Sequence, residues 1–278
     1  AGARIGTPVF APSLEVADYF EKAHYKLMAS PRIFPGQHVS AGVSSPDANL
    51  YIAYYGEGDE TCYVDVDNPD DPLNPSINVP KVPGPIFEVG LRLNKDVSLQ
   101  LSHVGWQGNP EVTFERPQHK GLMWKRAWVD AVDQLVGWSE MFRLVQNEGL
   151  GMISQGTREW TNYVVSADVT PHLVSRAGIA ARVQGLTRFY ALMVTLDQKV
   201  QLVKSVHAES VLAEAEFNWS LGDTLNMSLH LNGDTLIGEI NGAVVLTATD
   251  TALDSGAIGL VVADGRTATN TVTVAPLS

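Results

Sequence analysis

Polar side chains recur through an otherwise apolar stretch of the sequence, AGIAARVQGLTRFYALMV at residues 177–194. Side chains two residues apart on a β-strand share one face, so a hairpin here would sort polar groups from apolar ones. With a three-residue turn of Gly-Leu-Thr, Gln184 faces Arg188 and Arg182 faces Tyr190, all four on one face. The Arg182 and Gln184 side chains would then donate hydrogen bonds to ligand hydroxyls or a carboxylate, and the tyrosine ring would provide an apolar platform.

Two residues of the preceding loop, Arg158 and Trp160, would close the edge of this polar face. The predicted ligand-binding residues are therefore Arg158, Trp160, Arg182, Gln184, Arg188 and Tyr190. The opposite face is the predicted core, formed by Ala181, Val183, Phe189 and Ala191. A purely structural interpretation is also open, in which Arg182 pairs with a carboxylate and Tyr190 covers its aliphatic stem.

Motifs of nucleophilic, metallohydrolase and nucleotide chemistry are absent from the sequence. There is no G-x-S-x-G, no H-E-x-x-H, no P-loop and no dinucleotide-binding glycine pattern. The seven histidines are scattered, without a pair at metal-ligand spacing. Acidic residues from different strands can still meet in a sandwich enzyme, and the candidates are Glu148, Glu159, Asp168 and Glu239. We expect these carboxylates to be solvated, and we assign no catalytic residue and no metal ligand.

The segment EGDETCYVDVDNPDD, residues 57–71, is rich in acids and contains no base. Dense aspartates and loop carbonyls suit a hard cation, so one interpretation is a structural calcium ion held around Asp65, Asp67, Asp70 and Asp71. The spacing does not match an EF-hand loop, and we favour an acidic, solvated loop. No other cofactor is indicated.

The composition narrows the classes of partner. A chain of 278 residues with 45% hydrophobic residues suits one large β domain or two of ordinary size. The net charge of −12 argues against nucleic acid and against anionic membrane surfaces, which both attract an excess of Lys and Arg. No apolar run approaches the ~20 residues of a membrane-spanning helix. Cys62 is the only cysteine, so an internal disulfide is excluded and the cellular compartment stays open.

Alternation of apolar and polar residues predicts β-strands through most of the chain. In LNMSLHLNGDTLIGEINGAVVL, residues 225–246, two Asn-Gly pairs separate three such segments. Asn-Gly favours a type I′ turn because both turn residues need positive φ, so this segment predicts a three-stranded antiparallel meander. Helical spacing occurs in residues 12–28 and 123–138, which are also aromatic enough to form irregular strands. We expect a protein with almost no helix.

The strands form two blocks. The first contains HVSAGVS, NLYIAYYG, IFEVGLRL and VSLQLSHVGW, separated by connections rich in Pro and Gly. The polar, turn-rich segment ERPQHKG at residues 115–121 ends this block and is the expected domain boundary. Many short strands without β-α-β alternation favour sandwiches over parallel sheets. The predicted fold is therefore all-β, with one antiparallel β-sandwich (jelly-roll) domain at residues 1–118 and a second at residues 119–278.

Three segments carry a resemblance to known families: LQLSHVGWQGNPEVTFERP at 99–117, MWKRAWVDAVD at 123–133, and residues 142–193. Together they resemble the non-catalytic C-terminal region of some bacterial proteins of the ADP-ribosylglycohydrolase family. The pattern REWTNYVVSADVTP, AGIAARVQG and RFYAL is also similar to concanavalin-like jelly rolls, which include laminin-G-type and carbohydrate-binding modules. The resemblance implies a concanavalin-like second domain. It implies no catalysis, because the catalytic domain of that family is helical.

The resemblance implies a pair of non-catalytic modules that bind a polysaccharide or another glycan-like ligand for an attached catalytic domain. The sequence starts AGARIGTPVF, without an initiating Met or a signal peptide, which predicts a processed chain or a fragment of a longer protein. Two alternatives stay open. The sandwiches could be structural and mediate oligomerisation or protein contacts, or a glycoside hydrolase or polysaccharide lyase could use acids or Tyr190 on one sheet. We expect an accessory part of a hydrolase rather than an enzyme in itself.

Overall fold

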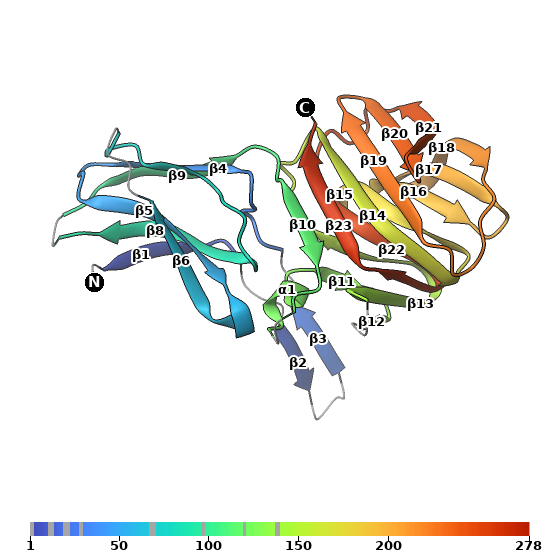
Figure 1. Ribbon diagram of the computed structural model, residues 1–278, viewed down its shortest axis with the longest axis horizontal. Helices are drawn as coiled ribbons and strands as arrows, with labels where there is room; N and C mark the ends of the chain where they lie inside the picture. Colours follow the sequence, from blue (N-terminus) through green and yellow to red (C-terminus); the bar gives the residue numbers. More distant parts are fainter. Residues whose placement is uncertain are drawn as a thin grey trace. The chain divides into compact units, whose positions relative to one another are not determined.

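The computed structural model divides the chain into two compact units (Figure 1). Unit 1 comprises residues 1–110 and 117–128, and unit 2 comprises residues 111–116 and 129–278. The domain boundary expected after residue 118 falls within residues 111–128. In this stretch the chain enters unit 2, returns to unit 1 and then enters unit 2 again. The structure describes residues 3–10, 30–66, 71–95, 98–118, 121–136 and 140–277, and the backbone of 14–18 and 23–27.

Unit 1 contains two antiparallel sheets that share one core. The first sheet has the order β1 (Arg4–Pro8), β8 (Ile86–Leu93), β5 (Ala48–Tyr55) and β6 (Thr61–Val66). The second has the order β7 (Ser76–Asn78), β4 (His38–Val43) and β9 (Leu101–Gln107). Leu50, Ile52 and Leu91 of the first sheet are buried in an apolar cluster with Val39 and Ala41 of the second. A 3-10 helix, η1 (Glu57–Asp59), lies between β5 and β6.

Both segments with helical spacing contain strands. Residues 12–28 include β2 (Leu14–Asp18) and β3 (Ala23–Leu27), which pair with each other, and the rest of this segment lies outside the described residues. Residues 123–138 form one short helix, α1 (Met123–Arg126), followed by β11 (Val129–Ala131) and β12 (Gln134–Val136). Of the two interpretations that the sequence leaves open for these segments, the strands are correct at these positions, because tertiary strand pairing overrides weak helical spacing. No described helix is long and apolar enough to cross a membrane.

Unit 2 is a sandwich of two antiparallel sheets, here named sheet I and sheet II. Sheet I has the order β10 (Val112–Glu115), β23 (Thr271–Pro276), β14 (Tyr163–Leu173), β19 (Leu225–Asn232), β20 (Thr235–Ile240) and β21 (Ala243–Thr249). Sheet II has the order β13 (Phe142–Gln155), β22 (Ala257–Thr269), β15 (Arg176–Gly185), β16 (Arg188–Thr195), β17 (Lys199–Val206) and β18 (Ala208–Glu216). The end of β14 also pairs with β22 and joins the sheets. The predicted all-β, jelly-roll architecture is confirmed.

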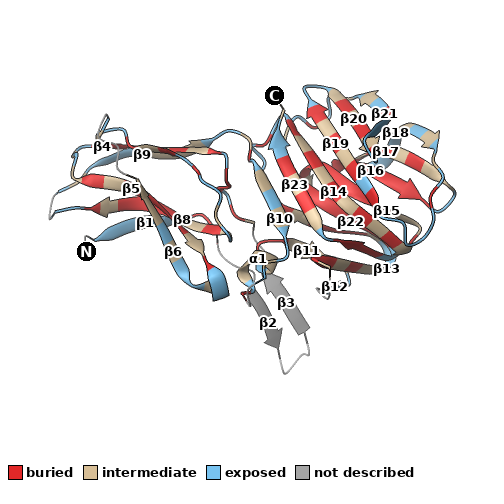
Figure 2. Cartoon of the chain, viewed as in Figure 1, coloured by how far each residue is buried: buried red, intermediate tan, exposed pale blue. Residues whose placement is uncertain are grey.

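The two sheets of unit 2 enclose its main core. Leu192 of β16 lies against Gly238 of β20, where an added Cβ atom would lie 2.6 Å from the leucine side chain. The strands β15 and β16 of sheet II are buried along almost their whole length (Figure 2). Ile179 pairs with Leu192 on the core side, whereas Ala180 and Met193 belong to a second buried cluster on the other side. Burial on both faces explains why β15 is apolar almost throughout.

The meander predicted at residues 225–246 is confirmed as β19, β20 and β21, which are neighbours in sheet I (Figure 1). At the second turn Asn241 has φ 52° and Gly242 has φ 78°, as a type I′ turn requires. At the first turn Asn232 pairs with Thr235, so the turn residues are Gly233 and Asp234 and not the predicted Asn232 and Gly233. The three strands and the second turn are predicted correctly, because the geometry of a tight turn depends on its own few residues.

The hairpin of β15 and β16 differs from its predicted register. Gly185 pairs with Arg188, so the turn has two residues and the predicted three-residue turn is wrong. Tyr190 pairs with Ala181 instead of Arg182. The register shifts between residues 181 and 185, where Arg182 has a positive φ of 48°. A β-bulge of this kind takes up extra residues and changes which face the following side chains point to.

Candidate functional site

The six predicted site residues divide into a buried group and an accessible group. The buried group, with exposed fractions of 1% or less, consists of Arg182, Tyr190 and Trp160. The accessible group consists of Arg158, Gln184 and Arg188. The prediction that Arg182 and Tyr190 lie opposite the core on an open face is therefore wrong, because both faces of β15 and β16 are buried.

Arg182 connects three loops from inside the sandwich. Its guanidinium donates to the carbonyl oxygens of Leu253 at 2.8 Å, Gly233 at 2.8 Å and Thr161 at 3.3 Å. Its backbone N–H donates to the Tyr163 hydroxyl at 2.7 Å. A buried charge is tolerated only when such partners replace water. Both terminal nitrogen atoms of Arg182 thus donate to carbonyl oxygens of the protein itself, and the side chain holds the three loops in place.

The Tyr190 hydroxyl holds the same loop as Arg182, the loop that contains Leu253. This group donates to Asp250 Oδ1 at 2.6 Å and accepts from the N–H of Leu253 at 3.1 Å. Burial and the hydrogen bond to Asp250 raise the pKa of Tyr190 to about 12. Burial alone would raise the pKa of Asp250, but hydrogen bonds from Lys204 and Tyr190 hold it below its usual range. This ionised carboxylate also accepts from the N–H of Ala252 at 2.9 Å and fixes the loop after β21.

Trp160 supports the same loop from the other side. Its ring packs edge-on against Tyr163, with the centroids 6.1 Å apart. Its carbonyl accepts from the N–H of Gly256 at 2.9 Å, and the Tyr163 hydroxyl lies 2.9 Å from the Gly256 carbonyl. A Cβ atom added at Gly156 would lie 2.5 Å from the indole ring. The ring is therefore part of the packed interior and does not face a ligand.

The accessible group converges on Gln184, which follows the bulge. Arg158 Nη2 donates to the Gln184 carbonyl at 3.2 Å, and Arg188 Nε and Nη2 donate to Gln184 Oε1 at 3.3 and 3.4 Å. The Gln184 amide donates to the carbonyl of Ser255 at 2.9 Å, in the loop that Arg182 and Tyr190 support. Leu186, at the tip of the hairpin, is 59% exposed. Two cations and an amide thus meet beside the turn between β15 and β16, which carries the exposed apolar side chain of Leu186.

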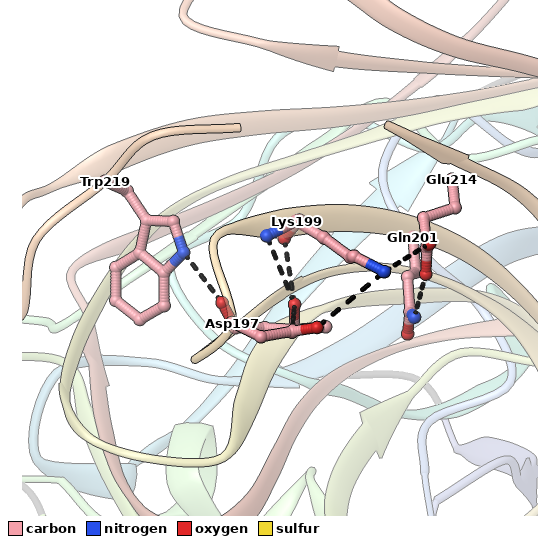
Figure 3. A network of polar contacts seen from close by, with 6 residues as sticks. Asp197, Lys199, Gln201, Glu214 and Trp219 are labelled. Carbon is pink, nitrogen blue, oxygen red and sulfur yellow. Dashed lines mark hydrogen bonds and ion pairs between the residues drawn. The ribbon is translucent and has the colours of Figure 1, made fainter. Parts of the chain in front are cut away.

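Another polar cluster lies on β17 and β18 of sheet II, and its charges are paired with each other (Figure 3). Lys199 Nζ lies 2.7 Å from Glu214, which also accepts from the Gln201 amide at 2.6 Å. These two donors hold the pKa of Glu214 below its usual range. Asp197 lies 3.8 Å from the same ammonium group. The single cation of this cluster is therefore shared by two carboxylates, and the ammonium group is not available to an anionic ligand.

Two of the acidic residues considered for catalysis have structural partners. Asp168 accepts from the N–H groups of Asn270 at 2.9 Å and Thr271 at 2.7 Å, at the turn between β22 and β23. Glu239 lies 3.3 Å from the imidazole of His230 on the neighbouring strand. Neither carboxylate is part of the accessible group.

The acidic loop is only partly described, because Asp67 and Asp70 lie outside the described residues. Asp65 is paired with two arginines of unit 1, at 2.7 and 3.1 Å. Asp71 accepts from the backbone N–H of Asn74 at 3.2 Å. Within the described ranges, no three His, Cys, Asp or Glu side chains are grouped to hold a metal ion.

Sequence reasoning missed Asp250 and Leu186. Asp250 meets Tyr190 across 60 positions of sequence, and no local pattern marks it. A signal for Leu186 does exist, because a large apolar residue beside Gly185 at a hairpin tip is expected to be exposed.

Comparison with known proteins gives structural matches only. No protein-family model matches the chain, and no curated protein matches it in sequence. The carbohydrate-binding module CBM66 from Bacillus subtilis has a TM-score of 0.50 and 18% identity, over 53% of this chain and 94% of that one. A Bacillus subtilis protein of unknown function with a galectin-like fold has a TM-score of 0.43 and 15% identity, over 54% and 89%. The GH43 protein BlXynB from Bacillus licheniformis has a TM-score of 0.46 and 13% identity, over 83% and 51%.

The match to CBM66 shows a shared fold over about half of the chain, and at 18% identity it shows the fold alone. The predicted likeness to carbohydrate-binding jelly rolls is confirmed at this level. None of the comparisons supports the resemblance to proteins of the ADP-ribosylglycohydrolase family.

Proposed function

We propose that unit 2 is a carbohydrate-binding module that holds a polysaccharide or another glycan-like ligand at the accessible group, extended by Leu186. The observation that carries this proposal is the convergence of two guanidiniums on Gln184 beside an exposed apolar turn. A sugar presents hydroxyl groups next to apolar C–H surfaces, so planar donors and an acceptor beside an apolar side chain complement it.

The buried group gives this site a rigid support. Gln184 is held by Ser255, and the loop that contains Ser255 is held by Arg182 and Tyr190. Side chains that are already fixed lose less conformational entropy when a ligand binds, which favours affinity. The shared fold with CBM66, a carbohydrate-binding module, agrees with the proposal. The further proposal of an attached catalytic domain rests on the sequence resemblance alone.

The test is a glycan-array and affinity-gel screen of the full chain, with a turnover assay on the same polysaccharides. We expect binding without turnover, at millimolar to micromolar affinity, or roughly −4 to −8 kcal/mol. Arg188→Ala and Gln184→Ala should each weaken binding about tenfold and leave the melting temperature unchanged, since each loses a hydrogen bond to the ligand worth about 1.5 kcal/mol.

The matched control is Arg266→Ala, which removes the same charge from an exposed position near the other end of β22. This variant should bind as the wild type does. Failure of the wild type to bind any glycan, or equal losses in all three variants, would contradict the proposal. Turnover would favour the alternative of a glycoside hydrolase or polysaccharide lyase.

One observation favours the structural alternative, in which unit 2 mediates oligomerisation. Leu173 at the end of β14, Leu196 between β16 and β17, and Leu221 between β18 and β19 are 69%, 56% and 47% exposed. The first two of these segments are joined by a hydrogen bond from the N–H of Leu196 to the Ser175 carbonyl at 2.9 Å. Exposed apolar patches mark protein interfaces. Sedimentation that shows a dimer, lost on Leu173→Asp, would support this alternative.

A further inference from the structure

The charge of the accessible group points to the class of glycan, an inference that rests on the proposed function. The protein is acidic, with 31 Asp and Glu against 19 Lys and Arg. In unit 2, Arg143 and Arg176 pair with the carboxylates of Glu140 and Glu209, and the buried Arg182 bonds to carbonyl oxygens inside the sandwich.

Arg158 and Arg188 differ from these arginines. Over the described part of the chain, no carboxylate lies within 4.0 Å of either guanidinium. This holds although Glu159 is the next residue after Arg158 and Asp254 lies beside Ser255 in the supporting loop. Asp254 accepts instead from the Ser255 hydroxyl at 3.1 Å. Their partners among the described residues are the backbone and side-chain oxygens of the neutral residue Gln184.

Two cations bonded to the backbone carbonyl and the side chain of the same neutral residue repel each other, and an anion placed between them relieves this repulsion. A guanidinium binds a carboxylate through two parallel hydrogen bonds, and such charge-assisted bonds are about twice as strong as neutral ones. A neutral sugar would gain only ordinary hydrogen bonds from these groups.

We infer that the glycan bound at the accessible group carries a carboxylate, as a uronic acid does. The guanidiniums of Arg158 and Arg188 bind the carboxylate, the Gln184 amide binds a neighbouring hydroxyl, and Leu186 contacts the apolar side of the ring.

The test compares three probes by calorimetric titration of the full chain: an oligogalacturonide, its methyl ester and a sulfated glycan of similar length. We expect the acid to bind at least tenfold more tightly than the ester, which has the same skeleton without the charge. Raising the NaCl concentration from about 0.05 to about 0.5 M should weaken binding of the acid and leave binding of the ester unchanged.

Arg158→Gln and Arg188→Gln should each reduce the preference for the acid by about tenfold, whereas Arg266→Gln should keep it. Arg188→Lys keeps the charge but loses the two parallel bonds, so it should restore only part of the preference.

Equal affinity for acid and ester would overturn this inference and leave the proposed function standing. A sulfated glycan that binds more tightly than the oligogalacturonide would also overturn it, because sulfate would then be the preferred anion. Absence of binding to every glycan, in this titration and on the array, would overturn both proposals.

Discussion

At the scale of single residues, Arg182 answers why an apolar strand contains an arginine. Arginine is almost never fully buried without partners. Here its three carbonyl partners belong to three different loops, so one side chain satisfies backbone groups that packing alone would leave unpaired. Arg182 therefore has a structural role and supports the accessible group. In our proposal the residues that contact the ligand are Arg158, Gln184 and Arg188.

Replacing Arg182 with alanine should therefore affect stability first. Arg182→Ala is expected to lower the free energy of unfolding of unit 2 by about 3 kcal/mol or more, because a fully buried side chain is removed and the carbonyls of three loops lose their charged donor. Thermal melting followed by circular dichroism measures the loss. Arg266→Ala is the matched control, since a substitution at this exposed arginine usually changes stability by less than about 0.5 kcal/mol. Equal melting temperatures for the two variants would argue against the supporting role.

The Asp250 carboxylate should make unit 2 sensitive to acid. Its pKa in the folded state lies below the ordinary value of 3.8, so the folded state holds the proton less tightly than the unfolded state. The stability that it contributes is present above the unfolded pKa and is lost as the pH falls through the folded pKa. Asp250→Asn should therefore melt below the wild type at neutral pH, and this difference should shrink below about pH 4. A difference that is constant across this range would contradict the assignment.

At the scale of elements, the bulge in β15 decides which side chains reach the surface. It lets Arg182 turn inward and places Gln184 beside Arg158 and Arg188. The backbone of the bulge is packed against Gly256, where an added Cβ atom would lie 2.4 Å from the carbonyl carbon of Arg182. This contact leaves room for glycine alone.

Gly256→Ala should thus disturb the bulge as well as the local backbone. Gly256 has φ 147°, and the added methyl group would collide with Arg182, so we expect a loss of more than about 2 kcal/mol. Gly233→Ala is the control, because Gly233 has φ 54° but open space around its Cβ position. It should lose only about 1 kcal/mol from the left-handed backbone. Chemical denaturation compares the two, and equal losses would show that the contact with Arg182 is unimportant.

At the scale of the whole molecule, the chain has two compact units with separate buried clusters. Each unit is large enough to unfold as a cooperative body. We expect differential scanning calorimetry to resolve two transitions. Arg182→Ala should lower only the transition of unit 2, and Leu50→Ala should lower only that of unit 1, by about 2–5 kcal/mol for a buried leucine. A single transition that both substitutions lower would contradict independent unfolding.

The sequence by itself determined the features that depend on neighbours along the chain. Alternation predicted the all-β fold, and the two Asn-Gly pairs predicted the meander of β19 to β21 and its turn at Asn241 and Gly242, because turn conformation is a property of a few adjacent residues. It also brought Gln184 and Arg188 together in one prediction, and the structure places them within hydrogen-bond distance.

Only the tertiary structure decided which of the candidate residues are accessible. Alternation predicts one buried face for a strand, but β15 is covered on both faces, and this depends on packing from distant segments. The partners of Arg182 and Tyr190 lie 21 to 71 positions away, so no local pattern reports them. A single bulge then changes the register of the hairpin, because a shift of one residue exchanges the two faces of a strand.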